Sequence, residues 1–196
     1  FASGDFVTAI GLINSDPKLL DDNSIGKAIM GGSLQCVKHV LSLKPKMHFL
    51  DAATAASCGH LHILKHLEGL GCPVNFYAPA FAAGNGHMHV LEHLFRQKCE
   101  FTHWCFERAA AFGDASILKW LLVTVKCEPE EFSDFFDPKD KASFSVVRFN
   151  HVDACALLLE HGLLTVGPAL LDIALKYKSW DVIKWVKDQN CTECAQ

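Results

Sequence analysis

Residues 58–75 read CGHLHILKHLEGLGCPVN, and residues 85–102 read NGHMHVLEHLFRQKCEFT. The second stretch repeats the glycine, the three histidines and the later cysteine of the first at the same offsets, with Gly86 in the place of Gly59. Histidine and cysteine packed this closely suggest a zinc site. A pattern that recurs at a fixed interval of roughly 20 to 50 residues, however, is first of all the signature of a repeat architecture. The interval therefore has to be explained before any chemistry is assigned.

The glycine of this pattern marks a column that runs through the whole chain. Three successive intervals of 27 connect Gly32, Gly59, Gly86 and Gly113. Three further segments fit the same register: Gly4 precedes Gly32 by 28, Asn150 follows Gly113 after an interval of 37, and Lys178 follows after another interval of 28. Seven copies of the unit thus cover nearly all of the 196 residues.

Each column of the repeat has a structural interpretation. Alanine-rich segments such as AATAAS run up to the glycine and predict a first helix, which the glycine ends in the left-handed conformation. Asn150 suits that position, since asparagine is the next most tolerant residue, whereas Lys178 departs from the pattern. The residue after the column occupies an N-cap position and is Asp, Ser or His: Asp5, Ser33, His60, His87, Asp114, His151 and Ser179. Apolar residues at helical spacing then predict a second, amphipathic helix.

These residues resemble the ankyrin repeat. The stretches AGNGHMHVLEHL and ASCGHLHILKHLEGLGCPVN follow its pattern of paired alanines, Gly-His-Leu, paired leucines and a Gly-Ala-Asp-Val-Asn turn. The ankyrin period is roughly 33 residues, and the deficit of 6 in this chain falls between Asn75 and Phe76, where the tip of the β-hairpin would lie. The sequence is therefore similar to a divergent class of short repeats with a GCP turn, found in protists and their giant viruses. The resemblance is most specific between residues 50 and 122.

The pattern and the resemblance together predict an all-α, ankyrin-like helix-turn-helix solenoid with shortened or absent β-hairpins. We expect one domain over residues 1–196, because stacked units bury a continuous core. Its seven units lie near residues 1–23, 24–48, 49–75, 76–102, 103–127, 139–165 and 166–196. The long interval before Asn150 leaves an acidic, aromatic insertion at about 128–138, and insertions in repeat arrays map to loops on one face.

The composition limits the classes of partner that we expect the chain to bind. The chain carries 18 Lys and Arg against 22 Asp and Glu, a formal net charge of -4, which gives no general electrostatic case for nucleic acid or an anionic membrane. It has no apolar run of the roughly 18 residues that a membrane helix needs. The chain begins inside a repeat at Phe1, so we expect a monomeric module of a longer chain. Several of the nine cysteines recur in the turn after the second helix, which favours reduced thiols and an intracellular, cytoplasmic environment.

One stretch resembles a catalytic motif. HVLEH, residues 89–93, matches the His-x-x-Glu-His signature of inverted zinc peptidases, with His89 and His93 on one helical face and Glu92 as base. Against a zinc-dependent hydrolase, His62 and His66 repeat the spacing with Lys65 in place of the glutamate. The His93 column is filled elsewhere by Trp120, Leu157 and Trp185, so a large, partly apolar side chain satisfies it. We therefore expect no catalytic residues, no metal and no cofactor, and treat the hydrolase as the alternative.

The resemblance implies instead that the chain binds another protein on a concave face. With the hairpin tips missing, the available positions are the residue that begins each first helix and the two residues before the glycine column. Aromatic and basic residues, the types that dominate interface energetics, collect there toward the C-terminal end. The predicted contact residues are Met30, Phe49, Phe76, Asn85, His103, Phe112, Arg148, Phe149, Lys176 and Tyr177. The alternative is that these aromatic residues cover gaps left by the hairpins.

The insertion offers a second candidate surface, with Phe132, Phe135 and Phe136 among six acids between Glu128 and Asp140. It is equally compatible with a binding loop and with an extra helical turn whose phenylalanines enter the core. The sequence thus predicts a non-enzymatic protein-protein interaction module. The families that it resembles suggest either a pathogen effector that targets a host protein, working in the host cytoplasm or nucleus, or a substrate adaptor.

Overall fold

The computed structural model describes residues 23–43, 46–126 and 142–193, and all regular structure in these ranges is helical. The helices are α2 (Ser24–Met30), α3 (Leu34–Leu43), α4 (Phe49–Ser57), α5 (Leu61–Gly69), α6 (Tyr77–Gly84), α7 (Met88–Arg96), α8 (His103–Phe112), α9 (Ala115–Trp120), the π-helical turn η2 (Leu121–Val125), α10 (Ala142–Arg148), α11 (Val152–Glu160), α12 (Pro168–Tyr177) and α13 (Trp180–Glu193). The unit predicted near residues 1–23 and the acidic insertion at 128–138 lie outside the described residues. None of the described helices is both long enough and apolar enough to cross a membrane.

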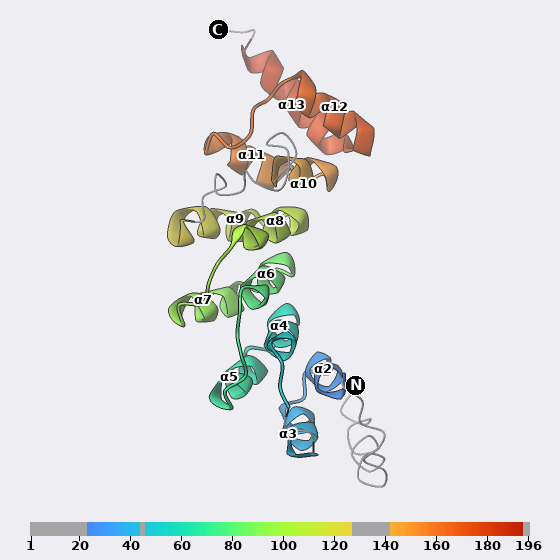
Figure 1. The fold of residues 1–196 in the computed structure, drawn as a ribbon. Helices are drawn as coiled ribbons and strands as arrows, with labels where there is room; N and C mark the ends of the chain where they lie inside the picture. The colour runs from blue at the N-terminus through green and yellow to red at the C-terminus, as the bar shows by residue number, and fades with distance from the viewer. Residues whose placement is uncertain (1–22, 44–45, 127–141, 194–196) are drawn as a thin grey trace. The chain divides into compact units, whose positions relative to one another are not determined.

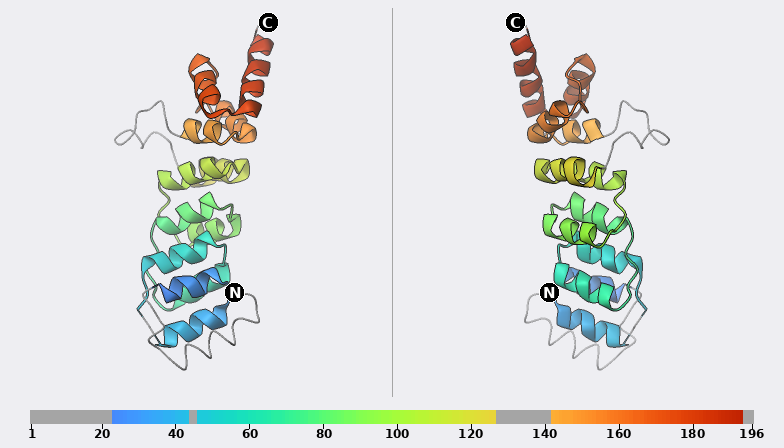
Figure 2. Two further views of the ribbon diagram at one scale, coloured as in Figure 1. Left: turned by 90° about the vertical axis from the view of Figure 1, so that its right-hand side faces the viewer. Right: turned by 90° about the vertical axis from the view of Figure 1, so that its left-hand side faces the viewer.

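The chain divides into two compact units, residues 1–100 and 101–196. In the first unit, α2, α4 and α6 stack in one row and α3, α5 and α7 lie in a second row (Figure 1). In the second unit, α8, α10 and α12 form the first row and α9, α11 and α13 the other. Figure 2 shows the helix pairs layered within each unit. The prediction of an all-α helix-turn-helix repeat fold is confirmed, and its joining into one continuous solenoid stays a prediction.

The interior of each unit follows the sequence columns. The alanines of the first helices, among them Ala52, Ala56 and Ala83, are fully buried, which lets α4 pack closely on α6. The second helices bury the apolar residues at helical spacing, including Ile63 and Leu67 in α5 and the equivalent Val90 and Leu94 in α7. Burying a leucine or isoleucine side chain contributes about 1.5–3 kcal/mol. A single pair cannot bury both of its faces alone, so the stacking of neighbours is the main stabilising contribution.

The turn between the two helices of each pair is fixed by the glycine column. Gly32, Gly59, Gly86 and Gly113 all have positive φ, between 71° and 84°. In the unit of α4 and α5 the amide of His60 donates to the carbonyl of Ala55 at 2.9 Å, the closing hydrogen bond of a Schellman motif. Asn150 and Lys178 adopt the same left-handed conformation, with φ of 63° and 58°. The register predicted for the last copy is therefore confirmed despite its lysine.

The histidines after the glycine column occupy the predicted N-cap positions, but their side chains do not cap their own helices. No side-chain cap hydrogen bond is made by His60, His87 or His151. The Nε2 atom of His87 donates instead to the carbonyl of Ser57, 30 residues earlier, at 2.9 Å, and His151 donates to Ala111 at 3.0 Å. His60 bonds the carbonyl of Met30 in the same way, while burial lowers the pKa of its ring. Each ring thereby satisfies a carbonyl at the end of the preceding repeat's first helix.

These rings lie directly on the glycines of the preceding repeat. A Cβ atom added at Gly59 would stand 2.8 Å from the ring of His87, and one at Gly32 would stand 2.9 Å from the ring of His60. The glycine column is consequently constrained twice, by its positive φ and by the imidazole that covers it. Histidine can follow the column only where the repeat before it carries a glycine.

Asn150 shows the alternative solution. Its Oδ1 accepts from the amides of Asp181 and Val182, both at 3.1 Å, so the side chain caps α13 in the next repeat. In the last repeat the residue after the column is Ser179, whose Oγ is buried and makes no hydrogen bond, so the expected side-chain cap by Ser179 is not formed. Asp114 behaves as expected and accepts from the amides of Ser116 and Ile117.

One repeat has a longer second helix. The residue with positive φ that follows the second helix lies 12 positions after the column in three repeats, at Gly71, Lys98 and Gly162. In the repeat of α9 it is Lys126, 13 positions after Gly113. The additional residue is accommodated by the wider π-helical turn η2.

The double constraint on the glycines can be tested with a matched pair of variants. Gly59→Ala and Gly71→Ala both place a Cβ at positive φ, 72° and 81°, but nothing lies within 4 Å of the Cβ position at Gly71. We expect Gly71→Ala to cost about 1–2 kcal/mol of unfolding free energy from backbone strain. Gly59→Ala should cost a further 1–3 kcal/mol or so from overpacking against His87. Chemical denaturation measures both.

The double variant Gly59→Ala/His87→Ser supplies the control, because it removes the ring that the new methyl group meets. Its loss of stability should be smaller than the sum of the losses of the two single variants. Strict additivity would show that ring and glycine are not coupled.

Candidate functional site

The zinc motif is the first candidate, and its three side chains bind three different partners. His89 Nε2 donates to the carbonyl of Gly59 at 3.0 Å, as His62 does to Gly32 at 3.3 Å. Glu92 pairs with Arg96 on the helix surface at 3.4 Å. In the part of the chain that the structure describes, no three His, Cys, Asp or Glu residues are grouped so as to hold a metal ion. The zinc-hydrolase alternative is unsupported.

His93 has a structural partner in the preceding repeat. Its Nε2 lies 2.8 Å from Oε2 of Glu68, with the histidine side chain 8% and the glutamate side chain 21% exposed. The pair joins α7 to α5 beside a groove of about 930 Å³, which is also lined by Lys65 and Lys98. A hydrogen-bonded pair that is largely removed from water holds neighbouring helices in register, since separating it would leave polar groups buried without partners.

Removal of the acid should therefore affect stability and not metal binding. We expect Glu68→Ala to lower the free energy of unfolding by about 1–3 kcal/mol, because His93 loses its buried acceptor. Neither equimolar Zn²⁺ nor a chelator should shift the thermal unfolding midpoint of the unaltered chain. Differential scanning fluorimetry and elemental analysis of the purified protein provide the measurements. Stoichiometric zinc that leaves with His89→Leu or His93→Leu would contradict this assignment.

The turn cysteines also bind across repeats. Cys72 Sγ donates to the carbonyl of His48 at 3.4 Å, and Cys99 Sγ donates to that of Asn75 at 3.7 Å. Both bonds reach back 24 residues, so they form another recurring inter-repeat contact. Burial raises the pKa of Cys72 to about 11 and that of Cys155, in α11, to about 12. Thiols in this state act as weak donors and small apolar groups, not as nucleophiles.

Cys191 departs from this column. Cys191 follows Lys178 by 13 positions, as Cys72 follows Gly59, and was expected in the same turn. That expectation is wrong, because α13 continues through Glu193 and so includes Cys191.

The raised thiol pKa values predict a pH dependence. Because the unfolded thiols ionise near the ordinary value of 9.0 and the folded ones only near 11 to 12, their contribution to stability is present below pH 9 and is lost as the pH rises above it. At pH 8 we expect Cys72 and Cys155 to be alkylated by iodoacetamide far more slowly in the folded chain than in denaturant. Peptide mass mapping gives the rates, and equal rates in the two states would refute the assignment.

On the surface of the first unit, two of the predicted contact residues belong to one aromatic cluster. Phe49 begins α4 and Phe76 precedes α6, and both stack on Tyr77, with ring centroids 5.7 Å and 4.4 Å away. Phe81 and His48 extend the cluster at 5.9 Å from Tyr77 and 4.1 Å from Phe49. We call these five residues the aromatic cluster. It lies where the connecting segments enter the first helices.

Met30 and Asn85 lie at the opposite ends of the first helices. Met30 ends α2 and is 55% exposed. The Asn85 amide donates to Ser57 Oγ at 3.2 Å and to the carbonyl of Phe81 at 2.8 Å, so it links two repeats. The structure therefore separates the residues predicted for this face into two sets, one at the start and one at the end of the first helices.

The second unit shows the same separation. His103 begins α8 beside Trp104, with ring centroids 6.1 Å apart, and Phe112 ends the helix with 48% of its surface exposed. A helix of 10 residues is about 15 Å long, so His103 and Phe112 lie at opposite ends of α8 and do not touch each other.

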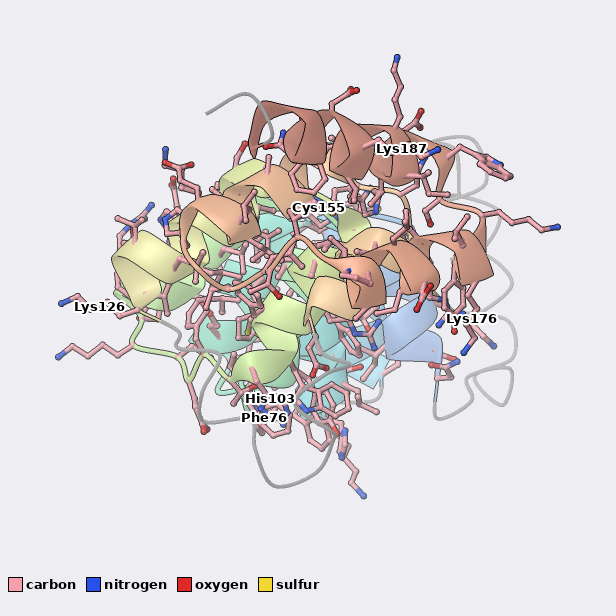
Figure 3. The ribbon with its side chains drawn as sticks, turned by 90° about the horizontal axis from the view of Figure 1, so that it is seen from above. Phe76, His103, Lys126, Cys155, Lys176 and Lys187 are labelled. Atoms are coloured by element: carbon pink, nitrogen blue, oxygen red, sulfur yellow. The ribbon has the colours of Figure 1, made fainter. Side chains whose placement is uncertain are left out.

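Four other predicted residues of this unit do come together. The Arg148 guanidinium lies 5.3 Å from the ring centroid of Phe149 and 5.4 Å from that of Tyr177. The Lys176 ammonium lies 5.5 Å from the same Tyr177 centroid. We call Arg148, Phe149, Lys176 and Tyr177 the cation cluster. It joins the ends of α10 and α12, and Figure 3 shows Lys176 on the outside of the unit.

Two aromatic residues at the starts of first helices were missing from the predicted set, the half-buried Tyr77 and the exposed Trp104. Tyr77 is the centre of the aromatic cluster, and Trp104 is 40% exposed beside His103. Each directly follows a predicted residue, so extending the helix-start column by one position would have found both. Phe132, Phe135 and Phe136 of the insertion lie outside the described residues.

Paired helices, a left-handed turn between them and stacking in two rows define an ankyrin-like repeat fold. Solved structures that share it include the following two. A chain from the structure of the predatory endopeptidase Bd0816 of Bdellovibrio bacteriovorus in complex with the immunity protein Bd3460 aligns with a TM-score of 0.59 and 21% identity, covering 86% of this chain and 99% of that one. The human ASB11 ankyrin repeat domain aligns with a TM-score of 0.57 and 18% identity, covering 88% of each chain. No protein-family model and no curated protein sequence matches the chain.

Proposed function

We propose that this chain is a non-enzymatic protein-protein interaction module that binds a partner through the exposed ends of its first helices. The observation that supports this most directly is the cation cluster together with the aromatic cluster. Both place aromatic or basic side chains at the surface of a scaffold formed by buried alanines and leucines. Tyr, Trp and Arg are the residues that most often dominate binding energy.

The residues that suggested chemistry have structural roles instead. The imidazoles of His87, His89 and His151 bind backbone carbonyls of neighbouring repeats, and His93 binds Glu68. The turn thiols donate to carbonyls as well. This supports assigning the conspicuous histidines and cysteines to the scaffold and the function to the helix ends.

The similar solved structures agree with a partner that is a protein. One of them is described as a complex of an endopeptidase with an immunity protein, and the other as an ankyrin repeat domain. A concave binding face, a cytoplasmic location and a role as pathogen effector or substrate adaptor remain proposals that follow from the ankyrin resemblance. Nucleic acid and membrane are not the proposed partners, since the net charge of -4 favours neither.

The experiment is affinity capture followed by mass spectrometry with three matched variants. The first carries Phe112→Glu, Phe149→Glu and Tyr177→Glu at the helix ends of the second unit. The second carries Phe49→Glu, Phe76→Glu and Tyr77→Glu in the aromatic cluster. The control carries Leu43→Glu, Phe95→Glu and Val123→Glu, which places the same charges on exposed apolar positions of the second helices. Circular dichroism verifies that each variant is folded.

We expect a partner to be captured by the unaltered chain and by the control, with affinity reduced at least about tenfold in one or both helix-end variants. The variant that loses the partner identifies the cluster in use. Equal capture by all four proteins would exclude the ends of the first helices as the binding site.

A further inference from the structure

The cation cluster brings two positively charged side chains to the same aromatic ring. Arg148 and Lys176 are both exposed, and both lie on the ring of Tyr177. The ion pairs of His93 with Glu68 and of Arg96 with Glu92 lie in the other unit. Neither cation of the cluster has a carboxylate within ion-pair distance in the described part of the chain. Because both cations lie within 5.5 Å of the same ring centroid, an anion bound beside Tyr177 is attracted by both of them.

The position of the Arg148 guanidinium determines which of its atoms can contact a ligand. Contact with the rings of Phe149 and Tyr177 restrains its planar guanidinium, while a guanidinium carries five N–H donors directed around its edge. None of those donors has a protein acceptor among the described residues. A planar donor edge that is restrained beforehand matches a carboxylate, which accepts two parallel hydrogen bonds from arginine. Restraint before binding also lowers the entropy lost on association.

We propose that the cation cluster is the subsite that takes Asp or Glu side chains from an acidic segment of the partner protein. Arg148 holds one carboxylate through paired hydrogen bonds, and Lys176 provides the second positive charge beside it. Phe149, 48% exposed, packs against an apolar residue that flanks the acids. This inference rests on the proposed function and adds the chemistry of the partner to it.

A protein segment fits the cluster better than a polyanionic surface does. Nucleic acid and anionic membranes are bound by extended basic patches, whereas these two cations belong to a chain with a net charge of -4. The exposed phenylalanine beside them adds an apolar contact that a short peptide can fill. Long polyanions would also meet the repulsion of the 22 acidic residues elsewhere on the chain.

The direct test is fluorescence anisotropy at low salt with a labelled hexaglutamate peptide, and with hexaglutamine as the uncharged control. The variants are Arg148→Gln/Lys176→Gln and the matched double variant Lys184→Gln/Lys187→Gln. The second pair removes two exposed lysines from α13 and so makes the same change in net charge. Figure 3 shows Lys187 on α13 and Lys176 at α12.

We expect hexaglutamate, and not hexaglutamine, to bind the unaltered chain. Arg148→Gln/Lys176→Gln should weaken binding at least about tenfold, and Lys184→Gln/Lys187→Gln less than about twofold. Arg148→Lys, which keeps the charge but loses the paired donors, should also weaken it measurably. Added salt should reduce the affinity, since the contacts are exposed. Absence of hexaglutamate binding, or equal loss in the two double variants, would overturn the inference.

Two further arms separate the other occupants and the proposed function. Tighter binding of a single-stranded oligothymidylate or of phosphatidylserine vesicles than of hexaglutamate would overturn the inference in favour of a phosphate-bearing partner. If a captured protein is lost with the Phe112, Phe149 and Tyr177 substitutions but retained by Arg148→Gln/Lys176→Gln, the interaction surface stands and the acidic segment does not. If every variant retains the captured protein, the ends of the first helices are not the binding surface. The proposed function is then contradicted, and the acidic-segment inference that rests on it is contradicted as well.

Discussion

The contact between an imidazole ring and the glycine of the preceding repeat is the constraint on which this fold depends. It satisfies a helix-end carbonyl, requires a backbone conformation that glycine adopts without strain, and leaves no room for a side chain at the column. Where a histidine follows the column, one interaction thus links the turn of a repeat to the packing of the next. The thiol-to-carbonyl bonds of Cys72 and Cys99 repeat the same principle at the other end of the helix pair.

The sequence predicted what is periodic within a repeat. The column glycines, the buried alanines and the apolar residues of the second helices were placed correctly, and even Lys178 adopts the expected left-handed conformation. The partner of each histidine could not be predicted in this way. An N-cap position suggests a hydrogen bond to the same helix, whereas His87 reaches a carbonyl 30 residues away. Such a bond depends on the spacing between stacked helices, which local sequence patterns do not report.

The same distinction applies to the candidate site: positions along a helix could be predicted, and contacts between repeats could not. The columns correctly predicted that Phe49 and His103 begin first helices and that Arg148 and Tyr177 end them. They could not predict that Arg148 lies on the rings of two repeats, because that depends on side-chain direction across a helix interface. Tyr77 was missed for a related reason. It lies one position after the helix-start residue Phe76, and its ring stacks on the two predicted rings, Phe49 and Phe76.

The hydrogen bond from His151 to Ala111 joins residues 40 positions apart, while its equivalent from His87 to Ser57 joins residues 30 apart. The two hydrogen bonds have nearly the same length, 3.0 Å and 2.9 Å. The packing of the His151 repeat on the Ala111 repeat therefore does not depend on how many residues connect them. That joint is a position where a repeat protein acquires new sequence without rebuilding its interior. A lineage can diversify there while the packed columns are retained, and a protein engineer can graft a foreign loop at the same place.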